Sequence, residues 1–155
     1  MIGTPRPWLH DELVHVPLVM RLPGGAEAGL RIGALTQPVD LPATFAVTLL
    51  PGSDAVPPTN GHNLWPLIRG EVEEIRRHAI AGIRVGEREN WLLRSTDWAF
   101  HLPVGQPEDE PPRKPQLFAK PEDRWEVNDL SQQQMELCEA MEKALREEAK
   151  PLSVR

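Results

Sequence analysis

The stretch that decides the fold runs from residue 78 to residue 102. It contains three apolar runs separated by two polar turns: His78-Ala79-Ile80-Ala81-Gly82-Ile83-Arg84-Val85, then Trp91-Leu92-Leu93-Arg94, then Trp98-Ala99-Phe100-His101-Leu102. In the last run Trp98, Phe100 and Leu102 share one face, because successive side chains of a strand point to opposite sides. The pattern predicts an antiparallel meander, and residues 116–119 add a fourth strand.

A terminal helix follows the predicted sheet. Ser131 and Gln134 have the spacing of a capping box, and Leu130 can pack on Met135 as a hydrophobic staple. Pro151 prevents the helix from continuing. The residues expected to face the sheet recur at helical spacing: Leu137, Cys138, Met141, Ala144 and Leu145.

The residues before the meander predict one more strand and one more helix. Residues 13–22 are almost continuously apolar, which is typical of a strand buried on both faces of a parallel sheet, with Pro17 at its beginning or on an edge. Asp40 is expected to be the N-cap of a helix that ends before Pro51. Residues 51–63 and 103–115 have the composition of loops. The fold class is therefore α/β.

Composition excludes several classes of function. The chain has 155 residues, enough for one ordinary domain, and a net charge of −6. That charge argues against binding to nucleic acid or to an anionic membrane. No apolar stretch approaches the roughly 20 residues of a membrane span, and no signal peptide precedes residue 13, so a cytoplasmic location is expected. A single cysteine, Cys138, excludes an internal disulfide.

The polar residues do not form a recognisable active site or metal site. His10 and His15 would lie on opposite faces of the predicted strand, and His62, His78 and His101 are expected in loops or on the sheet surface. The adjacent carboxylates of Asp11 and Glu12 could hold a divalent cation, but a solvated or salt-bridged loop before a strand is the preferred interpretation. Cys138 lies on the apolar stripe of the terminal helix, so we expect a core residue and not a nucleophile.

Three stretches, taken in order, resemble the sulfatase family, the formylglycine-dependent branch of the alkaline phosphatase superfamily. Leu9-His10-Asp11-Glu12-Leu13-Val14-His15-Val16-Pro17-Leu18 resembles its acid–acid–x–x–Arg–Val–Pro segment. Gln37-Pro38-Val39-Asp40-Leu41-Pro42-Ala43-Thr44, continued by residues 61–70, is similar to its "Val-Asp-Leu-x-Pro-Thr" helix start. Residues 93–100 and 116–130 resemble its arginine–turn–"Asp-Trp-Lys" strand and its closing strand, "Leu-Tyr-Asp…Asp-Pro…Glu-x-x-Asn-Leu".

The resemblance implies the C-terminal part of an alkaline-phosphatase-like fold. Residues 1–70 would be the end of the large α/β domain, with a strand, a helix and a loop. Residues 71–155 would be the C-terminal antiparallel subdomain with its terminal helix. The family's calcium and formylglycine belong to its upstream part, so neither cofactor is expected in this chain, and no residue here is assigned a catalytic role.

Departures from the family pattern bear on the site. Cys138 is followed by Glu139-Ala140-Met141, which does not match the family's Cys/Ser-x-Pro-x-Arg motif. A family lysine that contacts the sulfate falls on either Thr4 or Arg6, and only Arg6 keeps the charge. With Glu12, these residues form the expected rim of the substrate cleft.

The resemblance therefore implies a sulfatase-like sulfuric-ester hydrolase of which this chain is a C-terminal fragment or subdomain, inactive alone. The alternative is a non-catalytic binding or assembly module derived from a sulfatase. A remnant of a related phosphodiesterase or phosphotransferase is a third hypothesis, which the closing strand disfavours. An N-terminal sulfatase domain, or a second copy of the chain, is the expected partner.

Overall fold

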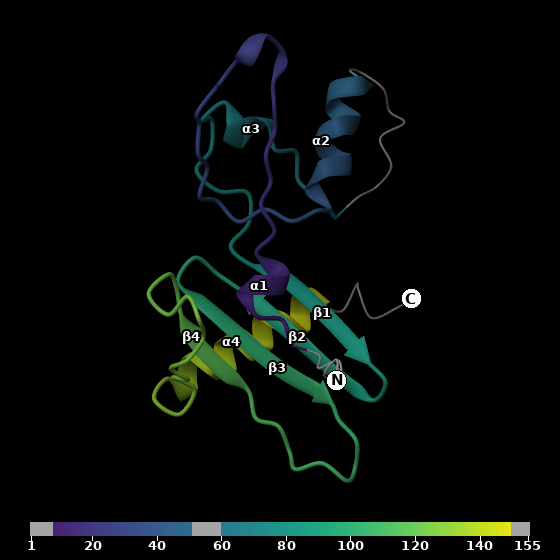
Figure 1. Cartoon of the computed structure of the whole chain (residues 1–155), viewed down its shortest axis with the longest axis vertical. Helices are drawn as coiled ribbons and strands as arrows, with labels where there is room; N and C mark the ends of the chain where they lie inside the picture. Colours follow the sequence, from purple (N-terminus) through teal and green to yellow (C-terminus); the bar gives the residue numbers. More distant parts are fainter. Residues whose placement is uncertain (1–7, 51–59, 150–155) are drawn as a thin grey trace, which may run out of the picture. The chain divides into compact units, whose positions relative to one another are not determined.

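A computed structural model describes residues 8–50 and 60–149 of the chain (Figure 1). The helices are α1 (Asp11–Val14), the 3-10 helix η1 (Pro23–Gly25), α2 (Asp40–Leu49), α3 (Trp65–Ile68) and α4 (Met135–Ala149). The strands are β1 (Ala79–Val85), β2 (Arg88–Arg94), β3 (Trp98–Gly105) and β4 (Gln116–Ala119). The α/β class is confirmed. None of the helices in the described ranges is long and apolar enough to cross a lipid bilayer.

The four strands form one sheet in the order β1-β2-β3-β4, which confirms the predicted meander. Strands β2 and β3 are antiparallel with Leu93 opposite Phe100, and β3 and β4 are antiparallel with Phe100 opposite Leu117. The first turn is shorter than expected, because β2 already begins at Arg88. Gly86, at a φ of 62°, adopts the left-handed backbone that this tight turn requires.

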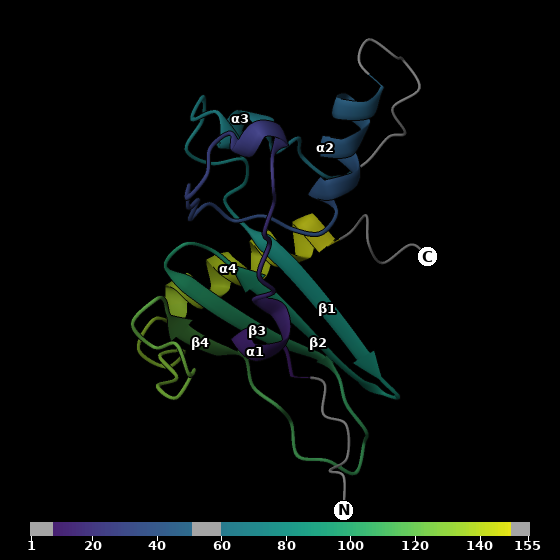
Figure 2. The same ribbon diagram turned by 45° about the horizontal axis from the view of Figure 1, so that its top comes forward.

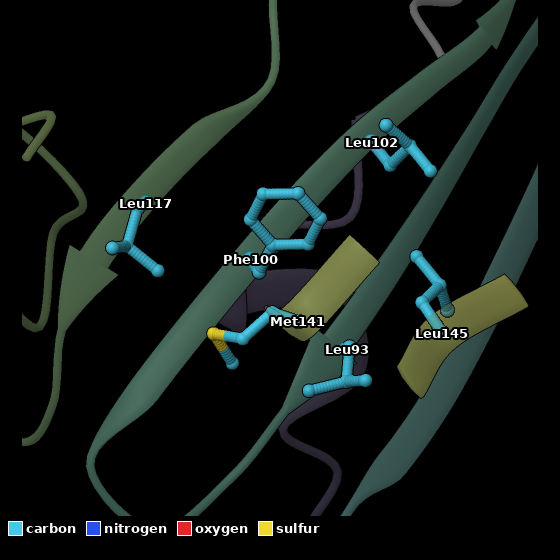
Figure 3. Close-up of a cluster of buried hydrophobic side chains, with 6 residues drawn as sticks. All are labelled: Leu93, Phe100, Leu102, Leu117, Met141 and Leu145. Atoms are coloured by element: carbon cyan, nitrogen blue, oxygen red, sulfur yellow. The ribbon is translucent and has the colours of Figure 1, made fainter. Parts of the chain in front are cut away.

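One face of the sheet is covered by α4. The buried cluster on this face, shown in Figure 3, contains Leu93, Phe100, Leu102, Leu117, Met141 and Leu145. Leu137, Cys138 and Ala144 pack against it while remaining partly exposed. The predicted apolar stripe of the terminal helix is therefore confirmed.

The opposite face of the sheet is covered by the segment that contains α1, so that α1 and α4 lie on opposite sides of the strands (Figure 2). A second buried cluster lies here, with Leu9 against Leu92, Ala99 and Phe118. Val14 of α1 packs on the same cluster. We call this side of the sheet the α1 face.

The start of the terminal helix was predicted incorrectly. Helix α4 begins at Met135, and residues 131–133 form a turn. The carboxylate of Asp129 organises this turn, because its Oδ1 accepts hydrogen bonds from the backbone of Ser131 at 2.9 Å and of Leu117 at 3.1 Å. The proposed staple is also wrong, since Met135 is exposed to solvent.

The predicted strand at residues 13–22 is wrong. Residues 11–14 form the short helix α1, residues 15–22 have no regular structure, and Leu13, Val16 and Val19 are exposed. A strand needs a neighbour to satisfy its backbone hydrogen bonds, and within ranges 8–50 and 60–149 no strand pairs with this segment. Pro17 also lacks a donor for such pairing.

The helix predicted after residue 39 is confirmed as α2, but Asp40 is not its N-cap. Val39 occupies that position, and Asp40 is the first helical residue. The fully buried carboxylate of Asp40 instead accepts hydrogen bonds from the backbone of Gln37 at 2.7 Å and of His62 at 2.8 Å, and it pairs with the guanidinium of Arg76. Asp40 therefore joins three segments that are distant in sequence.

The described chain forms two compact units, which do not follow the sequence boundary between residues 70 and 71. Residues 18–79 form one unit, and the sheet, α4 and the residues before 18 form the other. The 18–79 unit contains a cavity of about 650 Å³, lined mainly by the irregular segment 18–36 and by Leu64, Leu67 and Ile68. Whether residues 1–70 and 71–155 correspond to the family's two subdomains stays a prediction.

Candidate functional site

Strand alternation places polar side chains on the α1 face of the sheet. Phe100 and Leu102 face α4, so Ala99 and His101, at the alternate positions of β3, face the other way. Lys120 follows the last residue of β4, and His10 immediately precedes α1. We call the group that these side chains form the buried polar cluster; its members are His10, Asp11, His101, Lys120 and Glu126.

Glu126 is the centre of this cluster, and its backbone is unusual. Its φ of 54° lies in the left-handed region, which costs a residue with a Cβ of the order of 1 kcal/mol. The carboxylate of Asp123 holds the surrounding loop by accepting hydrogen bonds from the backbone of Val127 at 3.0 Å and of Asn128 at 2.8 Å. This loop geometry places the Glu126 side chain inside the protein, where it is 1% exposed.

The two carboxylate oxygens of Glu126 face different partners. Oε2 is contacted by Nδ1 of His10 and lies 3.3 Å from Nε2 of His101. Oε1 lies 3.0 Å from Nζ of Lys120. Lys120 also donates hydrogen bonds to Oδ2 of Asp11 at 2.8 Å and to the carbonyl oxygen of Arg124 at 3.3 Å. One oxygen therefore faces two imidazoles and the other faces an ammonium group.

These neighbours determine the charge of Glu126. Burial by itself raises the pKa of this carboxyl group. The ring nitrogens of His101 and His10 and the ammonium group of Lys120 outweigh that effect, and they hold the pKa at about 2, below the ordinary value of 4.5. Glu126 is therefore a carboxylate at neutral pH, and its charge is available to a cationic partner.

A cavity of about 320 Å³ opens beside the cluster. His10, His101 and Glu126 line it together with Asn90, and its remaining lining residues are Trp8, Arg113, Gln116 and Phe118. Asn90 is 2% exposed, and its Oδ1 has no hydrogen-bond partner in the part of the chain that the structure describes. The cavity therefore combines two imidazoles, a carboxylate and an unsatisfied amide oxygen.

Arg94 lies at the end of β2 and organises the turn that leads to β3. Its Nη1 donates hydrogen bonds to the carbonyl oxygens of Ser95, Thr96 (3.1 Å) and Trp98 (3.2 Å). Burial lowers the pKa of this guanidinium, while the charges of Asp11 and Glu126 oppose the shift. Its hydrogen bonds to the turn show that Arg94 has a structural role.

The described structure does not test the residues predicted to form the cleft rim. Thr4 and Arg6 lie outside the described residues, and Glu12 is exposed on α1. The assignment of Thr4, Arg6 and Glu12 to a substrate cleft stays a prediction.

The histidines were interpreted separately in the sequence, and the structure joins two of them. His101 was expected on the sheet surface, which is wrong, because it is 3% exposed and its ring centroid lies 5.2 Å from that of His10. Lys120 and Glu126 were not singled out, although both lie in the closing stretch that resembles the sulfatase pattern. The alternation of side chains along β3 was the signal that could have placed His101 on the other face of the sheet from Phe100.

Comparisons with known proteins find matches among solved structures. No protein-family model matches the chain, and no curated protein matches it. One similar solved structure is a sulfatase labelled BT33336S-sulf, described with the words "metabolism of multiple glycosaminoglycans by Bacteroides thetaiotaomicron is orchestrated by a versatile core genetic locus". The sequences are 20% identical and the TM-score is 0.49. The similarity covers 70% of this chain, which spans only 24% of that protein.

Proposed function

We propose that this chain is the C-terminal part of a sulfatase-like sulfuric-ester hydrolase, and that it supplies scaffold and cleft rim while another polypeptide segment supplies the chemistry. The observation that carries the proposal is the position of the residues that resemble the family pattern. In each of the three stretches these residues make buried structural contacts, so the family resemblance and the packing of this fold coincide.

The helix-start stretch is the first example. Asp40, the acid of the "Val-Asp-Leu" pattern, joins Gln37, His62 and Arg76 through its carboxylate. Thr44 extends the connection, because its hydroxyl donates to the carbonyl oxygen of Asp40 at 2.7 Å and accepts from the backbone of Leu64 at 3.0 Å.

The sheet provides the other two examples. Arg94, the arginine of the arginine–turn pattern, binds three carbonyl groups of the turn that follows it. Glu126 falls on the glutamate of the closing pattern, and it contacts His10 of the first stretch. Asp11 of the same stretch and Glu126 both bind the ammonium group of Lys120. Residues far apart in the sequence pattern are therefore partners in one buried polar cluster.

The sequence lacks the motif of the sulfatase nucleophile and the residues that bind calcium in the family. Formylglycine forms from a cysteine or serine in the family motif, and Cys138 has neither that motif nor the environment of a nucleophile. It packs on the α4 side of the sheet, and burial raises the pKa of its thiol. We infer that calcium and formylglycine belong to the upstream part of the enzyme, with Thr4, Arg6 and Glu12 near the rim of its substrate cleft.

Two measurements test the proposal. The purified chain, assayed on an aryl sulfate with and without calcium, is expected to give no turnover above a heat-denatured control, because the nucleophile and the metal carboxylates are missing. Turnover that follows the protein through purification would contradict the expectation.

The second measurement addresses the partner. An N-terminal sulfatase domain that ends before the region matched by residues 9–18 is mixed with this chain, and complex formation and aryl-sulfate turnover are followed together. Formation of a complex with turnover supports the proposed function. A complex without turnover favours the binding or assembly module, and the absence of both contradicts the proposal.

A further inference from the structure

We propose that His10, His101 and Glu126 form a binding site for a divalent transition-metal ion of the Zn²⁺ class, with room for an additional ligand in the adjoining cavity. The inference does not depend on the proposed function, because it rests on side chains that converge on the α1 face of the sheet.

The ligand set has the chemistry that zinc prefers. Zinc sites that retain an exchangeable position use three protein ligands, and two histidines with one glutamate are among the established combinations. The three side chains each offer one donor atom, and these atoms lie within 4.8 Å of one another. Bonds of about 2.0–2.2 Å to one ion place its tetrahedral ligands roughly 3.3 Å apart, and Nε2 of His101 lies 3.3 Å from Oε2 of Glu126.

A buried ring nitrogen without a hydrogen-bond partner supports the proposed site. His101 is 3% exposed, and its Nε2 has no partner with hydrogen-bond geometry among residues 8–50 and 60–149. Buried polar atoms are normally satisfied, so each exception requires an explanation. Coordination of an ion by this nitrogen would satisfy it. Nδ1 of His10 already contacts Oε2 of Glu126, and it can serve as a second ligand by exchanging that contact for the ion.

The cavity supplies the space for a further ligand. His10, His101 and Glu126 line one side of it, and Asn90 contributes a buried Oδ1 that also has no hydrogen-bond partner within the described part of the chain. This oxygen can accept a hydrogen bond from a water molecule or a hydroxyl group bound to the ion. A fourth ligand of this kind completes the four-coordinate geometry that zinc favours.

The ammonium group of Lys120 would compete with a bound ion for the carboxylate of Glu126. Its contacts nevertheless leave the oxygen that faces the two imidazoles available to the ion. Its ammonium group faces Oε1, whereas both imidazoles face Oε2. The carboxylate of Asp11, 2.8 Å from Nζ, balances the charge of Lys120. The charge of Glu126 can then balance part of the charge of the ion, as a buried ion requires.

Binding of Zn²⁺ and Co²⁺ to the whole chain, freed of any affinity tag, tests the proposal. One equivalent of Zn²⁺ is expected to bind by isothermal titration calorimetry and to raise the Tm, because the ion binds only the folded arrangement of ligands. Co²⁺ is expected to give the visible absorption of a four-coordinate complex, and Zn²⁺ to shift the ring resonances of His10 and His101.

Two variants decide whether the proposed ligands are used. His10→Gln and Glu126→Gln are each expected to weaken Zn²⁺ binding by at least about tenfold. Loss of a residue that only hydrogen-bonds to a metal ligand already weakens metal binding by about 10- to 100-fold, so loss of a ligand should cost no less. His15→Gln is the matched control, because His15 lies five residues away and is exposed. His10 is partly exposed, so its variant is expected to fold, and circular dichroism checks this.

Three outcomes would overturn the proposal. The first is the absence of one-equivalent binding to the folded wild-type chain at micromolar concentrations of the ion. The second is unchanged affinity in His10→Gln and Glu126→Gln, which would identify an adventitious surface site. The third is a loss of affinity in the His15→Gln control as large as that in His10→Gln.

Discussion

The ammonium group of Lys120 lies 3.0 Å from Oε1 of Glu126, and both side chains are 1% exposed. The same ammonium group binds the carboxylate of Asp11, which connects the segment before the sheet to the loop that follows β4. Removal of one partner of a buried ion pair leaves a charge without compensation in a poorly solvated environment. Lys120 is therefore expected to be essential for stability.

The first prediction is that Lys120→Met lowers the free energy of unfolding by about 3–5 kcal/mol, the usual cost of breaking a buried pair. Urea denaturation followed by far-ultraviolet circular dichroism measures the change. Lys114→Met is the control, because Lys114 is exposed in the loop between β3 and β4, and surface substitutions usually change stability by less than about 0.5 kcal/mol. Equal effects of the two substitutions would show that Lys120 does not stabilise the fold.

The sheet and terminal helix could be predicted because their signals are local. Trp98, Phe100 and Leu102 alternate along β3, and Leu137, Met141 and Leu145 recur with helical spacing, so each pattern identifies its own buried face. The sequence patterns do not show what covers the other face of the sheet. Leu9 and Val14 fulfil that role, and their contacts depend on a chain path of more than 60 residues between α1 and β1.

The buried polar cluster could not be predicted for a related reason. His10 is separated by 91 residues from His101 and by 116 from Glu126, so no motif spacing connects them. The apolar pattern of residues 13–22 was also assigned to a strand of a sheet. That assignment placed His10 and His15 on opposite faces of a strand that does not form. Tertiary structure alone shows that the loop around Glu126 turns its side chain toward His10.

The second prediction concerns the α4 side of the sheet. Met141→Asp is expected to lower the free energy of unfolding by several kcal/mol, roughly the cost of an unpaired charge in a core. Gln133 cannot serve as an opposite-face control, because it precedes the first residue of α4. Ala140→Asp is the control, since Ala140 is an exposed helical residue and the same new side chain should cost less than about 1 kcal/mol.

Thermal and urea denaturation of both variants measure the difference. A loss of stability that is as large for Ala140→Asp as for Met141→Asp would show that the helix packs on the sheet through another face. Retention of wild-type stability by both variants would indicate that α4 does not pack on the sheet in solution.

The third prediction is that Cys138 reacts slowly with alkylating agents. Burial, and secondarily the negative charge of Asp129, raise the pKa of its thiol above 9.0. Because the thiolate is the reactive form, the alkylation rate should rise with pH along a curve displaced to higher pH than in the urea-denatured chain. Mass spectrometry after timed exposure to iodoacetamide measures both curves. A native curve displaced to lower pH would mean that Cys138 occupies an activating environment.

The last prediction concerns residues 13–22, whose apolar side chains are exposed in the described structure. Val19 is 90% exposed, and Leu13, Val16 and Leu18 are also exposed. Exposed apolar segments with unpaired backbone groups promote association with other chains. We therefore expect the purified chain to self-associate as its concentration increases, unless a separate sulfatase domain covers this segment. Size-exclusion chromatography with light scattering across a concentration series measures the association.

Two double substitutions identify the surface responsible. Val16→Lys with Val19→Lys is expected to shift the chain toward monomer without changing its far-ultraviolet circular dichroism, because both side chains are exposed and new charges oppose apolar association. Trp125→Lys with Val127→Lys is the control, since these residues are also exposed but lie in the loop after β4. Unchanged self-association in the first variant, or a wild-type chain that stays monomeric throughout the series, would show that residues 13–22 do not form a contact surface.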